Sequence, residues 1–99
     1  MTKVVLSRLF VSKLKDILDY IELDNSKEVA NKIEHNIMEA IELLQLFPNY
    51  GQKVVNKRGK FKLHVLIVGY YRIIYSVSKE GVFVEDIVDS RMYHRLPQS

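Results

Sequence analysis

Cysteine is absent from this 99-residue sequence, and so are long apolar runs. The lack of cysteine excludes disulfide bonds and metal sites built on thiolates, and it suits the reducing cytoplasm. No apolar run approaches the roughly 20 residues of a membrane-spanning helix, and the opening residues, Met1–Arg8, lack the apolar stretch of a secretion signal. We therefore expect a cytoplasmic protein that does not associate with a membrane.

Internal repeats, low-complexity segments and linkers are also missing, so residues 1–99 are expected to form a single domain. With 47% hydrophobic residues, a chain of this length can bury one core. The three histidines, His35, His64 and His94, are scattered and do not make a zinc motif. We expect no metal and no cofactor, a surface position for His35, and a structural or exposed position for His64.

The stretch Tyr70–Ser78 is rich in aromatic and β-branched residues and contains no proline, which predicts a central strand. Similar runs at Phe61–Val68 and Val82–Val88 flank it, separated from it by short breaks that contain glycine. The simplest arrangement of these three strands is an antiparallel meander. Arg72 is the one charged residue in the central run, so it either faces solvent or occupies a site that needs a fixed cation.

The first half of the chain has the spacing of amphipathic helices. Lys3–Leu6 predicts a short edge strand, and Ser7 can cap the helix that follows it. This helix should have about 14 to 17 residues, because apolar residues recur every three or four positions at Phe10, Leu14, Ile17 and Ile21, with Leu18 widening the stripe. A break and second N-cap at Asp24–Ser26 precede a second helix with the apolar face Ala30, Ile33, Ile37, Ile41 and Leu44. The pattern predicts a helix hairpin over one face of the sheet.

Proline and glycine in Phe47–Gly51 end the helical half in a structured corner. Gln52–Lys60 is polar and basic, and we expect a loop there with a short strand around Val54–Val55. Ser90–Ser99 is too polar for a core element and is expected to form a partly ordered tail. This order predicts an α+β fold in which an N-terminal edge strand and a two-helix hairpin accompany an antiparallel sheet of about four strands.

Charge is distributed unevenly along the chain. Residues 1–50 hold 6 Lys or Arg and 8 Asp or Glu, a balance of −2, whereas residues 51–99 hold 9 and 4, a balance of +5. The densest positive cluster is Lys53, Lys57, Arg58, Lys60 and Lys62. Two interpretations of this cluster are equally open: a patch that faces phosphates, or a solvated loop whose lysines protect an edge strand from pairing.

Four features, in this order, resemble the RelE/ParE superfamily of toxins, the plasmid stabilisation family, and together they span nearly the whole chain. They are the helix hairpin ending at Leu44, the corner Phe47–Gly51 with its Pro-x-x-Gly pattern, Tyr71–Tyr75 in the central strand, and Val84–Val88 followed by Arg91. The resemblance implies the toxin half of a bacterial or archaeal type II toxin–antitoxin pair. It also implies a cognate antitoxin whose C-terminal segment wraps across the toxin, in an assembly that can be a heterotetramer.

The two branches of this superfamily act differently. RelE-like members cut messenger RNA in the ribosomal A site without a metal, whereas ParE-like members inhibit DNA gyrase and have no established hydrolytic site. In the ribonuclease branch the resemblance implies phosphate-binding roles for Arg72 and Arg91 and acid/base roles for Tyr93 and His94. Further cations that could bind RNA or another target are Lys57, Arg58, Lys60, Lys62 and Arg95. Asp89 stands where a histidine is frequent, so the catalytic set is incomplete.

These residues also have plainer interpretations. Arg72 can be a solvent-facing residue paired across the sheet with Glu85 or Asp86, and His94 can be an ordinary surface side chain. The incomplete acid/base set, the long hairpin and the corner favour a ParE-like toxin that inhibits DNA gyrase. The first alternative is a RelE-like ribosome-dependent endoribonuclease, and the second is an inactive relic that only binds its antitoxin.

Two spatial expectations follow. Apolar residues such as Val65, Ile67, Val82 or Val84 are expected on the sheet face that the helices leave open, where an acidic antitoxin segment would dock. The guanidinium groups of Arg72 and Arg91, together with the basic loop, are expected to converge on one exposed surface that binds a polyanion or an acidic peptide.

Overall fold

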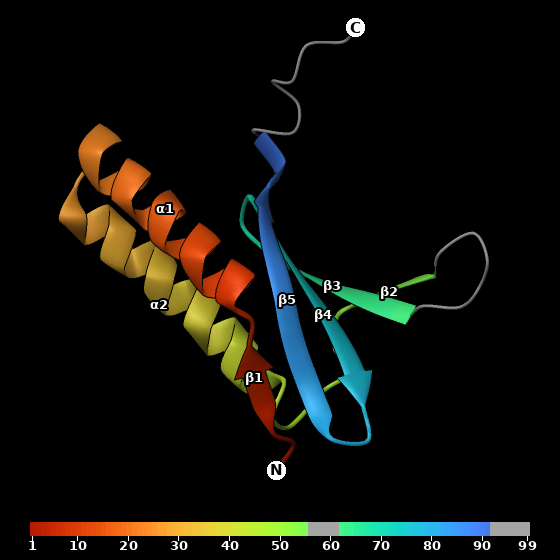
Figure 1. Cartoon of the computed structure of the whole chain (residues 1–99). Coiled ribbons are helices and arrows are strands. Elements are labelled where there is room, and N and C mark those ends of the chain that lie inside the picture. Colours follow the sequence, from red (N-terminus) through yellow and green to blue (C-terminus); the bar gives the residue numbers. More distant parts are fainter. Residues whose placement is uncertain (56–61, 92–99) are drawn as a thin grey trace, which may run out of the picture.

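The structure is a computed structural model that describes residues 1–55 and 62–91. Within these residues the chain forms two helices and five strands (Figure 1). In chain order they are β1 (Val4–Leu6), α1 (Arg8–Asp24), α2 (Lys27–Leu43), β2 (Gln52–Val55), β3 (Lys62–Val68), β4 (Tyr71–Ser78) and β5 (Gly81–Asp89). The predicted α+β fold, the helix hairpin and the N-terminal edge strand are confirmed.

Each helix begins at a serine whose side chain accepts a hydrogen bond from a free backbone N–H of the first turn. Ser7 accepts from the amide of Phe10 at 2.9 Å, and Ser26 accepts from the amide of Val29 at 3.1 Å. Such caps satisfy donors that a helix otherwise leaves without partners. Among the described residues, neither helix combines the length and the apolar character needed to cross a membrane.

The sheet has the strand order β1-β5-β4-β3-β2. The pairs from β2 to β5 are antiparallel, so the predicted meander of β3, β4 and β5 is confirmed, whereas β1 runs parallel to β5. The sheet is therefore mixed: the expected N-terminal edge strand lies beside four antiparallel strands, in agreement with the predicted sheet of about four strands. Both helices lie on the same side of the sheet, with α1 against β5 and α2 against β3 (Figure 1).

The core lies between the helix hairpin and the sheet face that it covers. Residues under 9% exposed there are Phe10, Leu14, Ile21, Ala30, Ile37, Ile41, Leu44, Leu66, Tyr71, Ile73, Tyr75, Val82, Val84 and Ile87. Burying one such aliphatic or aromatic side chain contributes roughly 1.5–3 kcal/mol, so the hairpin is held mainly by this layer. Tyr75 is fully buried, and its hydroxyl accepts a hydrogen bond from the Gly51 amide at 2.8 Å. This bond ties the corner that follows α2 to the central strand.

The opposite sheet face, which we call the open face, includes Val65, Ile67, Arg72, Ile74, Ser76, Phe83 and Val88. Val65 and Ile67 lie on this face as expected. The expectation for Val82 and Val84 is wrong, because both are buried under the helices and the residue between them, Phe83, is 43% exposed on the open face. Alternation along a strand shows that neighbouring side chains point to opposite faces of the sheet. It does not show which of the two faces the helices cover.

A β-bulge in β5 is hydrogen-bonded to the residue that caps the start of α1. Ile74 pairs with Asp86 and Tyr75 pairs with Val84, which leaves Glu85 as the extra residue. The carbonyl of Glu85 accepts a hydrogen bond from the Ser7 hydroxyl at 2.7 Å. The bulge therefore places a backbone acceptor where the β1–α1 junction needs one.

Candidate functional site

Six of the predicted site residues lie outside the described residues: Lys57, Arg58, Lys60, Tyr93, His94 and Arg95. Lys62 begins β3, and its side chain is also outside what the structure describes. Arg72 and Arg91 are the two predicted site residues whose side chains can be located, so the geometry of the candidate site depends on them.

Arg72 lies on the open face in the central strand, near the end at which β4 begins. It is exposed between buried Tyr71 and Ile73, and its neighbours across the sheet are Ile67 on β3 and Val88 on β5. Arg72 makes no ion pair with another described residue, and Asp86, one of its two expected partners, instead pairs with Lys13 of α1 at 2.7 Å. Among the described residues, the cation of Arg72 is therefore flanked by apolar side chains on both neighbouring strands.

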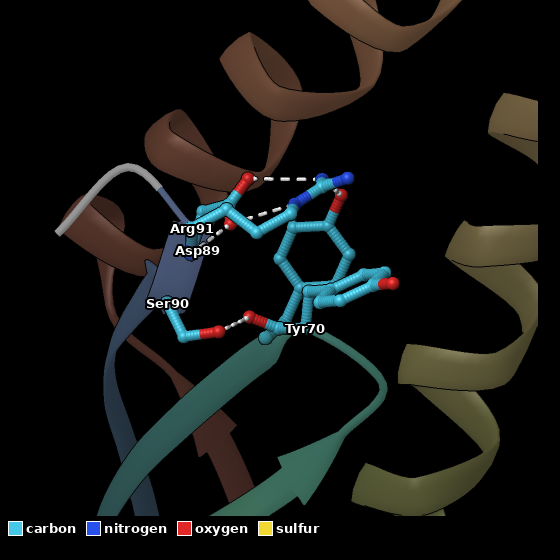
Figure 2. Close-up of polar contacts among 5 residues, drawn as sticks. Tyr70, Asp89, Ser90 and Arg91 are labelled. Carbon is cyan, nitrogen blue, oxygen red and sulfur yellow. Dashed lines mark hydrogen bonds and ion pairs between the residues drawn. The ribbon is translucent and has the colours of Figure 1, made fainter. Parts of the chain in front are cut away.

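Arg91, which follows β5, is held in a cluster at one end of the sheet (Figure 2). Its guanidinium group donates to Asp89 through Nε at 3.2 Å and through Nη2 at 3.1 Å, and Nη2 also donates to the Tyr71 hydroxyl at 3.2 Å. Its carbon centre lies 4.3 Å from the centroid of the Tyr70 ring, within the range of a cation–π contact. The hydrogen bonds to Asp89 raise the pKa of Arg91, so the group stays cationic and paired.

The same cluster fixes the two chain segments that enter and leave it. The Ser90 amide and the Ser90 hydroxyl both donate to the Tyr70 carbonyl, at 2.8 and 2.9 Å. Burial raises the pKa of the Tyr71 hydroxyl, although the nearby Arg91 cation opposes this shift. Tyr71 is 4% exposed, so Arg91 reaches the face of the sheet that the helices cover.

Arg72 and Arg91 therefore lie on opposite faces of the sheet, and their expected convergence on one exposed surface is wrong. Tyr71 and Arg72 are consecutive in β4, so their side chains point to opposite sides. Arg91 bonds the hydroxyl of Tyr71 and hence shares its side. The sequence places Arg91 near the end of β5, but the choice of face is made by its bonds to Tyr71 and Asp89.

The described part of the chain does not bring together the set that RNA cleavage would use. Arg72 and Arg91 are separated by the sheet, and the Arg91 guanidinium is engaged by Asp89 rather than directed at an open site. His35 is exposed and pairs with Glu39 at 3.3 Å, whereas His64 is 3% exposed and is therefore structural. No group of three metal-ligating side chains occurs among the described residues.

Sequence reasoning missed the cluster of Tyr70, Tyr71, Asp89 and Arg91 as a unit. The available signal was the pair of tyrosines that opens β4 together with the Asp-x-Arg spacing that closes β5. Because Tyr71 and Asp89 are register partners in adjacent antiparallel strands, the two motifs meet at the same end of the sheet. To predict that the two motifs meet, one needs the register of β4 with β5, which the sequence pattern did not specify.

Comparison with known proteins is consistent with this architecture. The family model described as the ParE toxin of the type II toxin–antitoxin system, parDE, matches residues 4–93. A solved structure titled "Chromosomal ParDE TA system from P. aeruginosa" has a similar fold, with a TM-score of 0.72, 18% sequence identity, and coverage of 90% of this chain and 96% of that chain. No curated protein gives a significant match. The extent of the family match shows that this chain belongs to the ParE toxin family of type II toxin–antitoxin systems.

Proposed function

We propose that this protein inhibits DNA gyrase and is neutralised by a cognate antitoxin. The observation that carries the proposal is the match to the ParE toxin model over residues 4–93. The positions of the two located arginines add support, because a gyrase inhibitor does not need them at one reaction centre. The toxin would act by binding gyrase or its bound DNA, without breaking a bond itself.

The ribonuclease alternative needs more than the described residues provide. Cleavage by attack of a ribose 2′-hydroxyl requires a general base, a general acid and cations around the phosphorane, all within a few ångströms of one phosphate. Arg72 lies on the open face, while Arg91 on the covered face is bound to Asp89. A single phosphate cannot contact both guanidinium groups in this arrangement.

Two assays on the purified protein separate the candidate functions. A gyrase supercoiling assay should show loss of supercoiled product as the protein is added, and in-vitro translation with toe-printing should show no codon-proximal cuts. The reverse pattern, with cuts in the messenger RNA and full supercoiling, would establish the ribonuclease alternative. If the protein neither reduces supercoiling by gyrase nor causes cuts in the messenger RNA, the result would support an inactive relic that only binds its antitoxin.

We further propose that the antitoxin docks an acidic, amphipathic segment on the open face. Ile67 is 54% exposed and Phe83 is 43% exposed, so this face offers apolar area that a partner can bury. Arg72 adds a cation beside Ile67, four residues along β4 from Ser76, which pairs with Phe83. An acidic side chain placed over Arg72 would fix the register of the segment and speed its association.

The docking proposal can be tested by co-expressing the protein with the product of the neighbouring small gene. Arg72→Glu should weaken the complex by about tenfold or more, because a charge pair in an apolar interface becomes a repulsion. Lys79→Glu makes the same change of charge in the exposed turn between β4 and β5 and should have a much smaller effect. Equal effects of the two variants would refute docking over Arg72.

A further inference from the structure

A hollow of about 380 Å³ opens on the covered side of the molecule, between the second half of α1 and the ends of β4 and β5. Its lining residues are Asp16, Ile17, Tyr20, Ile21, Asp24, Asn25, Tyr71, Asp89 and Arg91. It is therefore separated by the sheet from the open face proposed for the antitoxin. A volume of this size is comparable with that of small ligand pockets.

The inner part of the hollow is apolar. Ile21 and Tyr71 are 6% and 4% exposed, and Ile17 packs against the core beside them. The apolar surface of these side chains can bury the aliphatic part of an inserted side chain, which supplies affinity without a specific hydrogen bond. The polar groups of the hollow lie at its rim.

The rim has an excess of negative charge although the whole chain has a net charge of +3. Arg91 is paired with Asp89, but Asp16 and Asp24 make no hydrogen bond or ion pair with another described residue through their side chains. The two nearby lysines of α1 are each paired with another carboxylate, Lys13 with Asp86 and Lys15 with Asp19, although Lys15 also interacts electrostatically with Asp16.

The end of α1 adds to this field. A helix C-terminus carries a partial negative charge that basic residues usually offset. The last turn of α1 contains no basic residue and ends at Asp24 itself. A cation bound in the hollow would therefore reduce the repulsion between the carboxylates at the rim, while the N-terminus of α2, which begins at Lys27, partly offsets the charge of the α1 end.

Three rim residues are arranged to receive such a cation. Asp16, Tyr20 and Asp24 are spaced by four residues and so lie on one face of α1, with Tyr20 about 6 Å along the axis from each carboxylate residue. The Tyr20 side chain is 62% exposed, which leaves its ring accessible. A flat cation stacked on this ring would lie between the two carboxylates.

We propose that this hollow binds an arginine side chain of a partner polypeptide. The guanidinium group is planar, stacks on aromatic rings and forms bidentate hydrogen bonds with carboxylates. The ammonium group of lysine is instead a compact, strongly hydrated charge. The three methylene groups of arginine would cover Ile17 and Ile21. This site is distinct from the open face and does not depend on gyrase inhibition.

The test uses N-acetyl-arginine-methylamide as the probe and the full chain labelled for NMR. Titration should shift the resonances of Ile17, Ile21 and Tyr71, with a dissociation constant of about 1–10 mM, as expected for a ligand this small. The citrulline analogue has nearly the same shape without the charge and should bind at least about fivefold more weakly. The lysine analogue should also bind more weakly than arginine.

Matched variants locate the site. Asp24→Asn and Asp16→Asn should each weaken binding of the capped arginine by about threefold to tenfold, because each removes one rim charge. Glu22→Gln removes the same charge from an exposed α1 position that does not line the hollow, and it should leave binding within about twofold of wild type. The spectra also report whether each variant is folded. Equal binding of citrulline, equal losses in all three variants, or no shifts at 50-fold molar excess of the probe over protein would each overturn the proposal.

Discussion

The hydroxyl group of Ser7 serves two elements at once. It accepts a hydrogen bond from the Phe10 amide as the N-cap of α1, and it donates to the carbonyl of Glu85 at the bulge in β5. Ser26 caps α2 in the same way but lies in an exposed turn, with the Val29 amide as its donor. The two serines thus provide a natural comparison of a cap with and without a tertiary bond.

We expect Ser7→Ala to lower the free energy of unfolding by about 2 kcal/mol, since it removes a cap and leaves the Glu85 carbonyl without its donor. Ser26→Ala should cost about 1 kcal/mol, the usual effect of losing a cap alone. Chemical denaturation of both variants measures the difference. Equal losses would mean that the bond to Glu85 contributes nothing net to stability.

His64 is a buried residue whose ring has no polar partner among the residues that the structure describes. It is 3% exposed, neither ring nitrogen has a hydrogen-bond partner in the described part of the chain, and the ring stacks on Tyr75 at 4.9 Å between centroids. Burial, and secondarily the charge of Lys53, lowers the pKa of His64 below 6.5. The folded state therefore holds this imidazole neutral at a pH where the unfolded chain begins to protonate it.

This difference makes stability depend on pH with a definite sign. Well above pH 6.5 both states carry neutral His64, and as the pH falls through that value the unfolded state takes up a proton first. Stability should then decrease by up to about 1.4 kcal/mol per pH unit until the folded pKa is reached. His64→Phe keeps the ring stacking and should remove this part of the decrease in denaturation curves between pH 7 and pH 5. His35→Gln changes an exposed histidine and should keep it; an unchanged pH profile in His64→Phe would contradict the assignment.

At the scale of elements, the pairing of β1 with β5 depends on a close approach at Gly81. Gly81 has a φ of +135°, and an added Cβ would lie 2.3 Å from the Lys3 carbonyl oxygen. That oxygen accepts the first hydrogen bond of the pair, from the Val82 amide at 2.8 Å. Gly69, in the turn before β4, has a φ of +60° but has nothing within 4 Å of the same position.

Gly81→Ala should therefore lower the free energy of unfolding by about 3 kcal/mol, through backbone strain and displacement of β1. Gly69→Ala introduces only the strain of the left-handed conformation, without a steric clash, and should lower the free energy of unfolding by about 1 kcal/mol. Thermal or denaturant unfolding distinguishes the two. A Gly81→Ala protein as stable as Gly69→Ala would show that β1 can move away at no cost.

Local patterns predicted the helices well because their signals are local. The caps at Ser7 and Ser26 and the apolar spacing from Phe10 to Ile21 specify a helix that has 17 residues in the structure. The strand runs were likewise identifiable from composition. Which face each strand residue takes was not, as Val82 and Val84 illustrate, because it depends on the register with β4 and on where the hairpin packs.

The same reason separates the two arginines of the candidate site. Arg72 could be assigned to the central strand from its neighbours, and its exposure on the open face agrees with one of the two expected positions. Arg91 lies beyond the last strand, where no alternation applies, and its direction is determined by Asp89, Tyr71 and the ring of Tyr70. The two motifs that meet there are visible in the sequence, but their meeting depends on the register of β4 with β5, which the pattern alone does not give.

At the scale of the whole molecule, the sheet divides two surfaces of different character. The open face carries apolar side chains around Arg72, and the covered side carries the hollow with the acidic rim at the end of α1. One chain can therefore present a surface for an acidic segment and a separate site for a cationic one. The antitoxin is the occupant that we propose for the first.

The most direct measurement is a gyrase supercoiling assay in which the purified protein is added first alone and then with increasing amounts of the neighbouring gene product. We predict that supercoiling stops with the protein alone and recovers fully as the added partner reaches a one-to-one ratio. Full supercoiling in the presence of excess folded protein would contradict gyrase inhibition. Inhibition that persists after the partner has bound would instead contradict neutralisation.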